Sequence, residues 1–333
     1  MAACFTVIVL HIVVANWHSL NVRSFEWQIL NLYHGGLVRW AVPVFVMISG
    51  ALFLNPDKNI PIKKIYTKYI FRIVTALAFW SFIYACAGYF AGRSDIVEAF
   101  TNFLNGHYHL WFLYMIIGLY MIVPLVRRIA ESESATKYFL VFALIFTSLL
   151  PECANILSLF SDKYGNMLED FANKFYMQFV GGFTVYFLLG HFMNQADISP
   201  KSERLIYIAG LCGFMITVLL SAYASILTGK PNETFYSGLK FNLNTICESA
   251  AVFVFFRKHF NRENIAVQKL SQYSFGAYLV HAAVIPVIRN LGLHPLTFTP
   301  VISVPVIAVI VFVISFTISA VLNHIPVLKK YVV

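Results

Sequence analysis

Long apolar runs separated by short polar connections make up almost the whole chain. A transmembrane helix needs about 20 mostly apolar residues. About ten runs approach this length, at roughly 1–17, 38–54, 70–91, 109–126, 138–151, 176–193, 205–227, 243–257, 272–290 and 300–322. The runs are continuous rather than alternately apolar and polar, which argues against a membrane β-barrel. We therefore predict an all-α polytopic membrane protein with about ten transmembrane helices in one domain, residues 1–333.

Composition supports this class, because 59% of the residues are hydrophobic and only 12% are charged. A soluble domain of this size carries roughly twice that charged fraction. The longest polar stretches, 18–37, 152–175 and 228–242, are too short for a separate soluble domain. We expect them on the outer side, where they would shape a mouth over the membrane.

The net charge of +9 would suit nucleic acid or a membrane surface, and the distribution of the cations favours the membrane. Connections alternate between rich and poor in lysine and arginine, as the positive-inside rule predicts. The rich set holds Lys58, Lys63, Lys64, Lys68, Arg72, Arg127, Arg128, Lys137, Lys201, Arg204, Arg257, Lys258, Arg262, Lys269, Lys329 and Lys330. We assign this face to the cytoplasm, with both termini inside, and expect membrane lipids rather than nucleic acid as partners.

The five cysteines fall mainly in or near apolar runs, and none forms a close pair such as CxxC. This spacing predicts neither a disulfide framework nor a metal site. We expect them to be buried as small hydrophobic side chains.

The first apolar run, Met1 to Trp17, is short for a membrane crossing. As a helix it covers about 24 Å, whereas the hydrocarbon core is about 30 Å thick. A cleavable signal peptide is an alternative, but the positively charged segment that begins such peptides is missing. We expect that the native first helix starts upstream of Met1.

Three histidines lie within apolar runs, namely His11, His109 and His281. Ionisable groups in hydrocarbon are costly, so they usually face a cavity, pair with a partner or do chemistry. A neutral imidazole can take a proton from an alcohol near pH 7, and for His11, in mid-helix, we favour this role. For His281 a carbonyl partner in a neighbouring helix stays equally open. For His109 the alternative is a hydrated interfacial histidine beside the aromatic anchor Trp111.

A basic stripe leads into the third apolar run, where Lys64, Lys68 and Arg72 recur every four residues. In an α-helix this spacing places them on one face. They could clamp the phosphates of a cytosolic donor, or they could signal topology and contact lipid phosphates. No glycine-rich phosphate loop accompanies them, so both interpretations stay open.

Two other features have structural and functional interpretations. The segment Pro43–Gly50, which contains Ser49, breaks a helix with proline and ends in small residues. By physics alone it predicts a kink and close helix packing. Glu248 lies near the outer end of the run 243–257, and it could pair with a cation such as Lys240 or line an acceptor pocket.

Taken in order, several of these elements resemble a known family. They are His11 in the first helix, Pro43–Gly50 (P-x-F-x-x-x-S-G), the basic start of the third helix, His109–Leu113, Tyr186–Gly190 and Ser274–His281. In this order and spacing, the whole chain resembles a membrane acyltransferase of the acyltransferase-3 family.

The resemblance implies that an acyl group, usually acetyl, moves from cytosolic acyl-CoA to a hydroxyl of an envelope glycan or its lipid-linked precursor. The setting would be the bacterial inner membrane, with acetyl-CoA as co-substrate and no permanently bound cofactor. His11 matches the catalytic histidine of the first helix, as a general base or a transient acyl carrier. Family members commonly carry an arginine eleven positions earlier, which here would precede Met1. Some members append an extracytoplasmic hydrolase domain that this chain lacks, so transfer would finish in the membrane domain.

On this interpretation the remaining residues take supporting parts. They are Lys64, Lys68 and Arg72 for the donor, His109, Trp111 and Glu248 for the acceptor, and Ser49, Tyr278 and His281 as supporting polar groups.

Two other classes remain as alternatives. A transporter of an anionic solute or a lipid-linked saccharide could use the same histidines as a proton relay. However, transporters often show internal repeats and paired broken helices, and we find neither. A non-catalytic scaffold of the envelope is the third class, and an oligomer is compatible with each of them.

Overall fold

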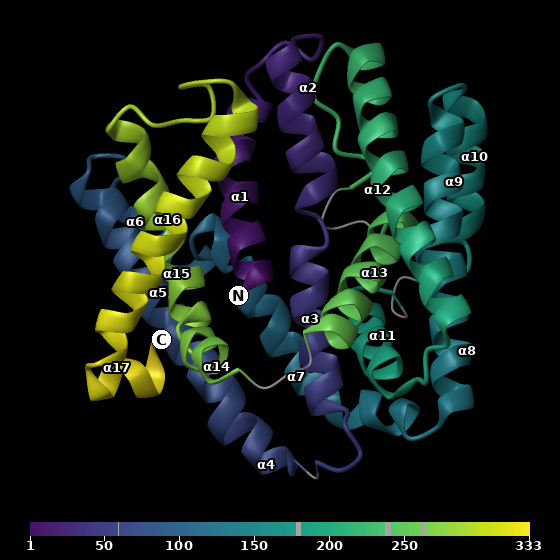
Figure 1. Ribbon diagram of the computed structural model, residues 1–333, viewed down its shortest axis with the longest axis horizontal. Coiled ribbons are helices and arrows are strands. Elements are labelled where there is room, and N and C mark those ends of the chain that lie inside the picture. Colours follow the sequence, from purple (N-terminus) through teal and green to yellow (C-terminus); the bar gives the residue numbers. More distant parts are fainter. Residues whose placement is uncertain (59, 178–180, 237–240, 261–263) are drawn as a thin grey trace.

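The computed structural model describes residues 1–58, 60–177, 181–236, 241–260 and 264–333, and in these ranges the regular structure is helical, with no strand (Figure 1). The elements are α1 (Ala2–Trp17), α2 (Phe25–Asn31), η1 (Leu32–Leu37), α3 (Ala41–Phe53), α4 (Ile62–Lys64), η2 (Ile65–Ile70), α5 (Phe71–Phe90), α6 (Ile96–Asn105), η3 (Tyr108–Leu110), α7 (Trp111–Ala130), α8 (Glu133–Ala143), η4 (Leu144–Leu149), α9 (Leu150–Ser158), α10 (Asp162–Asn173), α11 (Phe183–Gln195), α12 (Pro200–Thr228), α13 (Leu243–His259), α14 (Ile265–Ser271), α15 (Ser274–Asn290), α16 (Pro300–Asn323) and α17 (Pro326–Tyr331). Of these, η1, η2 and η4 are π-helical, and η3 is a 3₁₀ turn.

Each predicted apolar run contains a helix, and the described residues hold six helical segments long and apolar enough to cross a membrane. These are Phe25–Phe53, Ile62–Phe90, Ile96–Ala130, Glu133–Ser158, Pro200–Thr228 and Pro300–Asn323. The class predicted from the sequence, a multi-pass helical membrane protein, agrees with this architecture.

The polar range 18–37, which we assigned to the outer side, contains the helical elements α2 and η1. Ser24 accepts a hydrogen bond from the backbone N–H of Trp27 at 3.2 Å and so caps α2. Trp27 and Leu30 are fully buried, and α2 runs through η1 into α3 as the segment Phe25–Phe53. The cap and the buried side chains three residues apart explain why this stretch folds as a helix despite its polarity.

Helices α3 and α11 pack with their backbones almost in contact. A Cβ atom added at Gly50 would lie 1.8 Å from the carbonyl oxygen of Phe187, and one at Gly190 would lie 2.1 Å from that of Met47. Only glycine leaves room for this approach. The close packing expected of the Pro43–Gly50 segment is therefore present, with α11 as its partner.

The basic connections gather at one end of the bundle. The guanidinium of Arg127 donates to the carbonyl oxygens of Phe53 (2.6 Å) and Lys58 (3.2 Å), which joins the α7–α8 and α3–α4 connections. The ammonium of Lys258 lies 2.6 Å from Glu203, joining the end of α13 to the start of α12. Helices α4, α14 and α17 lie in the lower half of Figure 1, and α2 lies at the top. A single basic end is what the alternating charges predict.

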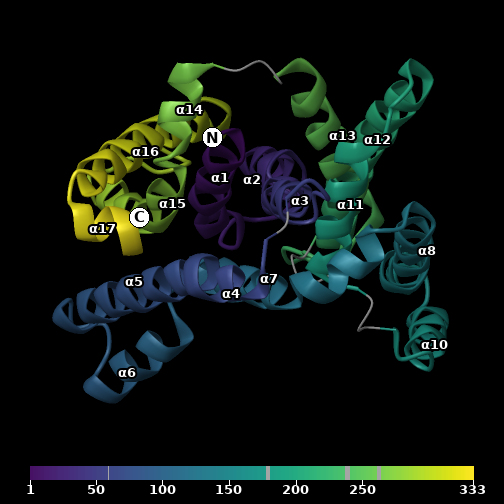
Figure 2. The same ribbon diagram turned by 90° about the horizontal axis from the view of Figure 1, so that it is seen from below.

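Helix α1 lies in the middle of the molecule. Seen from below, it stands between α15 and α16 on one side and α2 and α3 on the other, and α5 and α7 run across one face (Figure 2). Its packing partners include α15, α16, α3 and η1. A side chain in mid-α1 can therefore meet groups from several distant parts of the chain.

Candidate active site

The three histidines singled out in the sequence meet at one point. The ring of His11, on α1, stacks on that of His281, on α15, with 5.2 Å between centroids. The ring of His109, in η3, lies 5.2 Å from that of His281. We call these three residues, together with His107 and Tyr108, the histidine cluster.

His107 and Tyr108 were not predicted to belong to it. Nδ1 of His107 lies 2.9 Å from Nδ1 of His109, and the ring of Tyr108 lies 5.1 Å from that of His11. The signal that could have revealed them is the tripeptide His107-Tyr108-His109 just before an apolar run. In a 3₁₀ turn such neighbours stay close together, which an α-helical spacing argument overlooks.

Hydrogen bonds define the protonation pattern of two of the rings. Nδ1 of His281 lies 2.5 Å from the carbonyl oxygen of Tyr278, so Nδ1 carries the proton and donates. Its Nε2 is then an acceptor, and this atom is buried without a hydrogen-bond partner in the described part of the chain. Nε2 of His109 faces the carbonyl oxygen of Leu279 at 3.3 Å, so Nδ1 of His109 accepts from His107. A buried acceptor without a partner is costly unless a ligand satisfies it.

His11 differs from its neighbours in access. Its side chain is partly exposed, whereas His109 and His281 are 1% and 0% exposed. Within the described ranges its contacts are ring contacts, to His281 and Tyr108, and no hydrogen bond holds it. An imidazole that is partly exposed and makes no hydrogen bond to the protein is suited to exchange protons with a reactant.

A cavity of about 420 Å³ is linked to this cluster through Tyr278. Ser49, Arg72 and Tyr278 are among the residues that line it. The ring of Tyr278 lies 5.6 Å from that of His281, and its hydroxyl donates to the carbonyl oxygen of His109. Tyr278 therefore forms a common wall between the cavity and the histidine cluster.

Of the three cations in the predicted stripe, Arg72 is among the residues that line this cavity, and Lys64 and Lys68 are exposed. The guanidinium of Arg72 donates to an oxygen of Val333 at 2.5 Å. The π-helical turn η2, Ile65–Ile70, lies between Lys64 and Arg72. Lys68 itself lies in this turn, and the one-face arrangement of the three cations stays a prediction.

The other two predicted acceptor residues, Trp111 and Glu248, have partners outside the histidine cluster. The ring of Trp111 faces Phe183 of α11 at 5.7 Å. Glu248 is 7% exposed, and one carboxylate oxygen, Oε2, has no hydrogen-bond partner in the described residues. Its suggested partner Lys240 lies outside the described residues. The cation that does act on the Glu248 carboxylate is Arg39.

Arg39 is a functional candidate that the sequence analysis missed. It follows the π-helical turn η1, and its Nε donates to the carbonyl oxygen of His34 at 2.5 Å. Its guanidinium carbon lies 4.2 Å from the ring centroid of Tyr236. Burial raises the pKa of the Tyr236 phenol, so the hydroxyl stays protonated beside the guanidinium. The signal that could have revealed Arg39 is a charged residue at the start of the apolar run 38–54, four residues before Pro43.

The four imidazoles of the cluster do not form a metal site. Among the described residues, no group of three or more histidine, cysteine, aspartate or glutamate side chains could hold a metal ion. The chemistry open to the cluster itself is proton transfer and nucleophilic attack by nitrogen.

The fold and the site together define a multi-pass helical membrane protein with a buried histidine cluster next to a cavity. A comparison with models of protein families matches residues 1–324 to the acyltransferase-3 family, described as an acyltransferase domain. The chain therefore belongs to this family, as its motifs suggested. Searches of curated proteins and of solved structures each found no match.

Proposed function

We propose that the protein transfers an acyl group, with acetyl as the expected group, from cytosolic acyl-CoA to a hydroxyl of a cell-envelope glycan or a lipid-linked sugar. The setting would be the bacterial inner membrane. Family membership supports acyl transfer. The observation that carries the proposal is the meeting of His11, His109 and His281 from three distant helical elements.

The donor would enter from the basic end. The cavity of about 420 Å³ has Arg72 among its lining residues and shares Tyr278 with the histidine cluster. CoA phosphates would bind Arg72, with the exposed Lys64 and Lys68 nearby on the same segment. The thioester would then lie toward Tyr278, with Ser49 as a further polar group in the cavity wall.

In the simplest mechanism His11 acts as a general base. Its imidazole takes the proton of the acceptor hydroxyl while the oxygen attacks the thioester carbonyl carbon. The carbon–sulfur bond breaks, and the CoA thiolate leaves with the proton that His11 has taken up. In the alternative, the His11 nitrogen attacks the thioester, the carbon–sulfur bond breaks, and CoA leaves as the thiol with a proton from the imidazole. The acceptor hydroxyl then attacks the acyl-imidazole and returns its proton to the His11 ring. His281 would support either route through its stacked ring.

The acceptor would approach from the opposite end of the bundle. His109, in the cluster, and Trp111, two residues further on, are the proposed contacts, Trp111 by stacking on a sugar ring. Glu248 would contribute through its carboxylate oxygen without a partner. Its proximity to Arg39 makes the two residues a candidate polar pair lining this side.

The test is an acyl-transfer assay with purified protein, radiolabelled acetyl-CoA and membrane glycans. We expect CoA release and labelled glycan, and His11→Ala should lower the rate by about 10²–10⁴-fold. His324→Ala is the matched control, because His324 is exposed on the last turn of α16 and bonds only the carbonyl oxygen of Ala320. Equal rates for His11→Ala and the unsubstituted protein would overturn the role of His11. Solute flux into proteoliposomes without an acyl donor would instead favour the transporter.

A further inference from the structure

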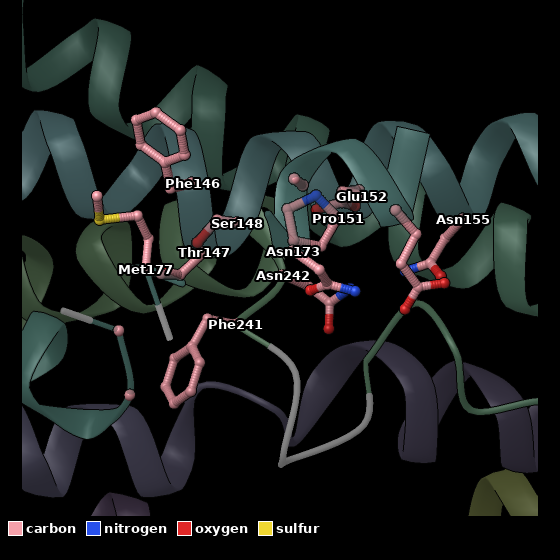
Figure 3. A pocket seen from close by; sticks show the side chains of 14 residues that line it. Phe146, Thr147, Ser148, Pro151, Glu152, Asn155, Asn173, Met177, Phe241 and Asn242 are labelled. Atoms are coloured by element: carbon pink, nitrogen blue, oxygen red, sulfur yellow. The ribbon is translucent and has the colours of Figure 1, made fainter. Parts of the chain in front are cut away.

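A second pocket, of about 340 Å³, lies away from the histidine cluster (Figure 3). It is lined by residues of η4, α9 and α10 and by the segments that precede α11 and α13. Its volume falls at the lower end of the range of about 300–1,000 Å³ in which proteins hold small molecules. None of the steps proposed above for acyl transfer involves this pocket.

The lining combines amide and hydroxyl groups with aromatic rings. In Figure 3 the apolar side chains Phe146, Met177 and Phe241 lie on one side of the pocket, and Asn155 lies on the other. Ser148 and Asn242 lie between them. Sugars combine hydroxyls that both donate and accept hydrogen bonds with apolar C–H faces, so this lining matches a sugar ring better than a purely apolar ligand.

Two buried polar atoms in this pocket have no hydrogen-bond partner among the described residues. They are the hydroxyl oxygen of Ser148, whose residue is 1% exposed, and Oδ1 of Asn242, whose residue is 3% exposed. The amide nitrogen of Asn242 donates to the carbonyl oxygen of Thr234 at 3.4 Å, which orients the side chain. Buried polar atoms are nearly always satisfied. These two are therefore expected to bond a ligand in the pocket.

The neighbouring carboxylates set the charge of the pocket. Oε2 of Glu152 accepts from the backbone N–H of Leu243 at 2.7 Å, so it holds the start of α13 next to Asn242. Glu169 is exposed at the rim. None of the described lining residues is a lysine, arginine or histidine. An anionic sugar would meet two carboxylates and no cation, and would be repelled.

Aromatic contacts connect this pocket to the histidine cluster. The ring of Phe241 lies 5.4 Å from that of Phe183, which in turn lies 5.7 Å from Trp111. Trp111 follows His109 by two residues at the start of α7. A row of rings thus extends from the proposed acceptor contact to the wall of the pocket, as a surface along which a saccharide chain can lie.

We propose that this pocket, between η4, α9 and α10, binds a neutral sugar unit of the acceptor glycan, away from the hydroxyl that is acylated, and that it excludes anionic units. This inference rests on the proposed function. It adds that the acceptor is an oligosaccharide rather than a single sugar, and that the unit bound here carries no uronate or phosphate.

The first test is equilibrium binding without any acyl donor, by calorimetry on the protein in lipid nanodiscs. Nanodiscs are needed because maltoside detergents carry sugar headgroups of their own. The probes are chitotriose and maltotriose, which are neutral, and trigalacturonic acid, which is anionic. We expect at least one neutral trisaccharide to bind at least about tenfold more tightly than the anionic one. The reason is that the two carboxylates of the pocket would repel a negatively charged sugar and weaken its binding.

Substitutions of pocket residues test whether the sugar binds in this pocket. Ser148→Ala and Asn155→Ala should each weaken binding of the neutral sugar about three- to tenfold, the effect of one lost hydrogen bond. Glu169→Gln should reduce the discrimination against trigalacturonic acid. Asn102→Ala, at an exposed position of α6, is the control and should leave binding unchanged. Binding that none of the pocket variants alters, tighter binding of the anionic sugar, or no binding of any probe would overturn the proposal.

CoA release measured on the same preparations separates this inference from the proposed function. Normal CoA release together with unaltered sugar binding in the variants would reject the subsite alone. Sugar binding that the variants weaken, in a protein that never releases CoA, would keep the subsite and reject acyl transfer.

Discussion

His11 and His281 have stacked rings, but they differ in what each can do. His11 is partly exposed and has ring contacts only, whereas His281 is sealed and donates through Nδ1 to the carbonyl oxygen of Tyr278. A buried ring whose orientation is fixed by a hydrogen bond to a backbone carbonyl is suited to position its neighbour. Of these two rings, His11 is therefore the one suited to contact a reactant, and on the proposed mechanism His281 would position it.

This division can be tested with His281→Phe, which keeps an aromatic ring against His11 and removes Nε2. We expect the rate of CoA release to fall by about 10²-fold, because small displacements of a catalytic group cost that much. The KM for acetyl-CoA should stay nearly unchanged, since His281 is not among the residues lining the 420 Å³ cavity. A loss confined to KM, with kcat intact, would contradict the positioning role.

Arg39 connects three groups from distant parts of the chain. Replacing it with leucine would leave the carbonyl oxygen of His34 without its donor and would remove the cation whose charge acts on Glu248. We expect destabilisation of about 1–3 kcal/mol for each buried group left unsatisfied. Thermal unfolding in detergent measures it. Arg39→Lys should recover only part of the loss, because lysine lacks the planar fork that bonds His34 and covers Tyr236; full recovery would show that charge alone matters.

At the scale of elements, departures from the regular α-helix coincide with the candidate sites. The π-helical turn η1 precedes Arg39, η2 separates Lys64 from Arg72, and η4 forms a wall of the second pocket. The 3₁₀ turn η3 carries His109. Such irregular turns re-aim side chains and are frequent at functional sites. The regular α-helices between these turns pack closely, above all α3 against α11, and so hold the sites in place.

That close packing can be tested at Gly190. A methyl group there would lie 2.1 Å from the carbonyl oxygen of Met47, so Gly190→Ala forces α3 and α11 apart. We expect a loss of at least about 1–3 kcal/mol of stability, as for other overpacked sites. Gly118→Ala on α7 is the control, since nothing lies within 4 Å of its added Cβ, and it should be neutral or stabilising. Equal unfolding temperatures for the two variants would contradict the close packing.

At the scale of the molecule, the basic connections mark one end and the second pocket lies away from them, on the α9–α10 side. If the basic end is cytoplasmic, acyl-CoA and the glycan reach the histidine cluster from opposite sides of the membrane. The positive-inside rule supports that orientation. A histidine in mid-α1 would then be the point at which the two reactants meet.

Thiol labelling in intact cells tests the orientation. Lys64→Cys and Lys330→Cys should resist a membrane-impermeant maleimide until the cells are opened, and Glu26→Cys, on α2 at the other end, should react at once. All three positions are exposed. The unsubstituted protein corrects for its five native cysteines. Immediate labelling at Lys64→Cys would place the basic end outside.

The sequence by itself determined the class of protein, the helical runs and the three histidines that the fold brings together. Continuous apolar stretches leave a helix as the way to satisfy the backbone in lipid, and a histidine within such a stretch stands out because it is costly there. The family motifs follow from residue order alone. His11, His109 and His281 were accordingly found without coordinates.

Only the tertiary structure decided which of these residues act together. Sequence spacing assumes a uniform α-helix, so it did not predict the π-helical turn η2 that contains Lys68 and leads to Arg72. It could not relate Arg39 to Glu248, because the turn that carries Arg39 and the helix α13 that carries Glu248 come together only through packing. Nor could it show that the His11 side chain is partly exposed while that of His281 is fully buried. The exposure of a side chain and the groups it contacts depend on segments far apart in the chain. Those segments meet only once the helices have packed.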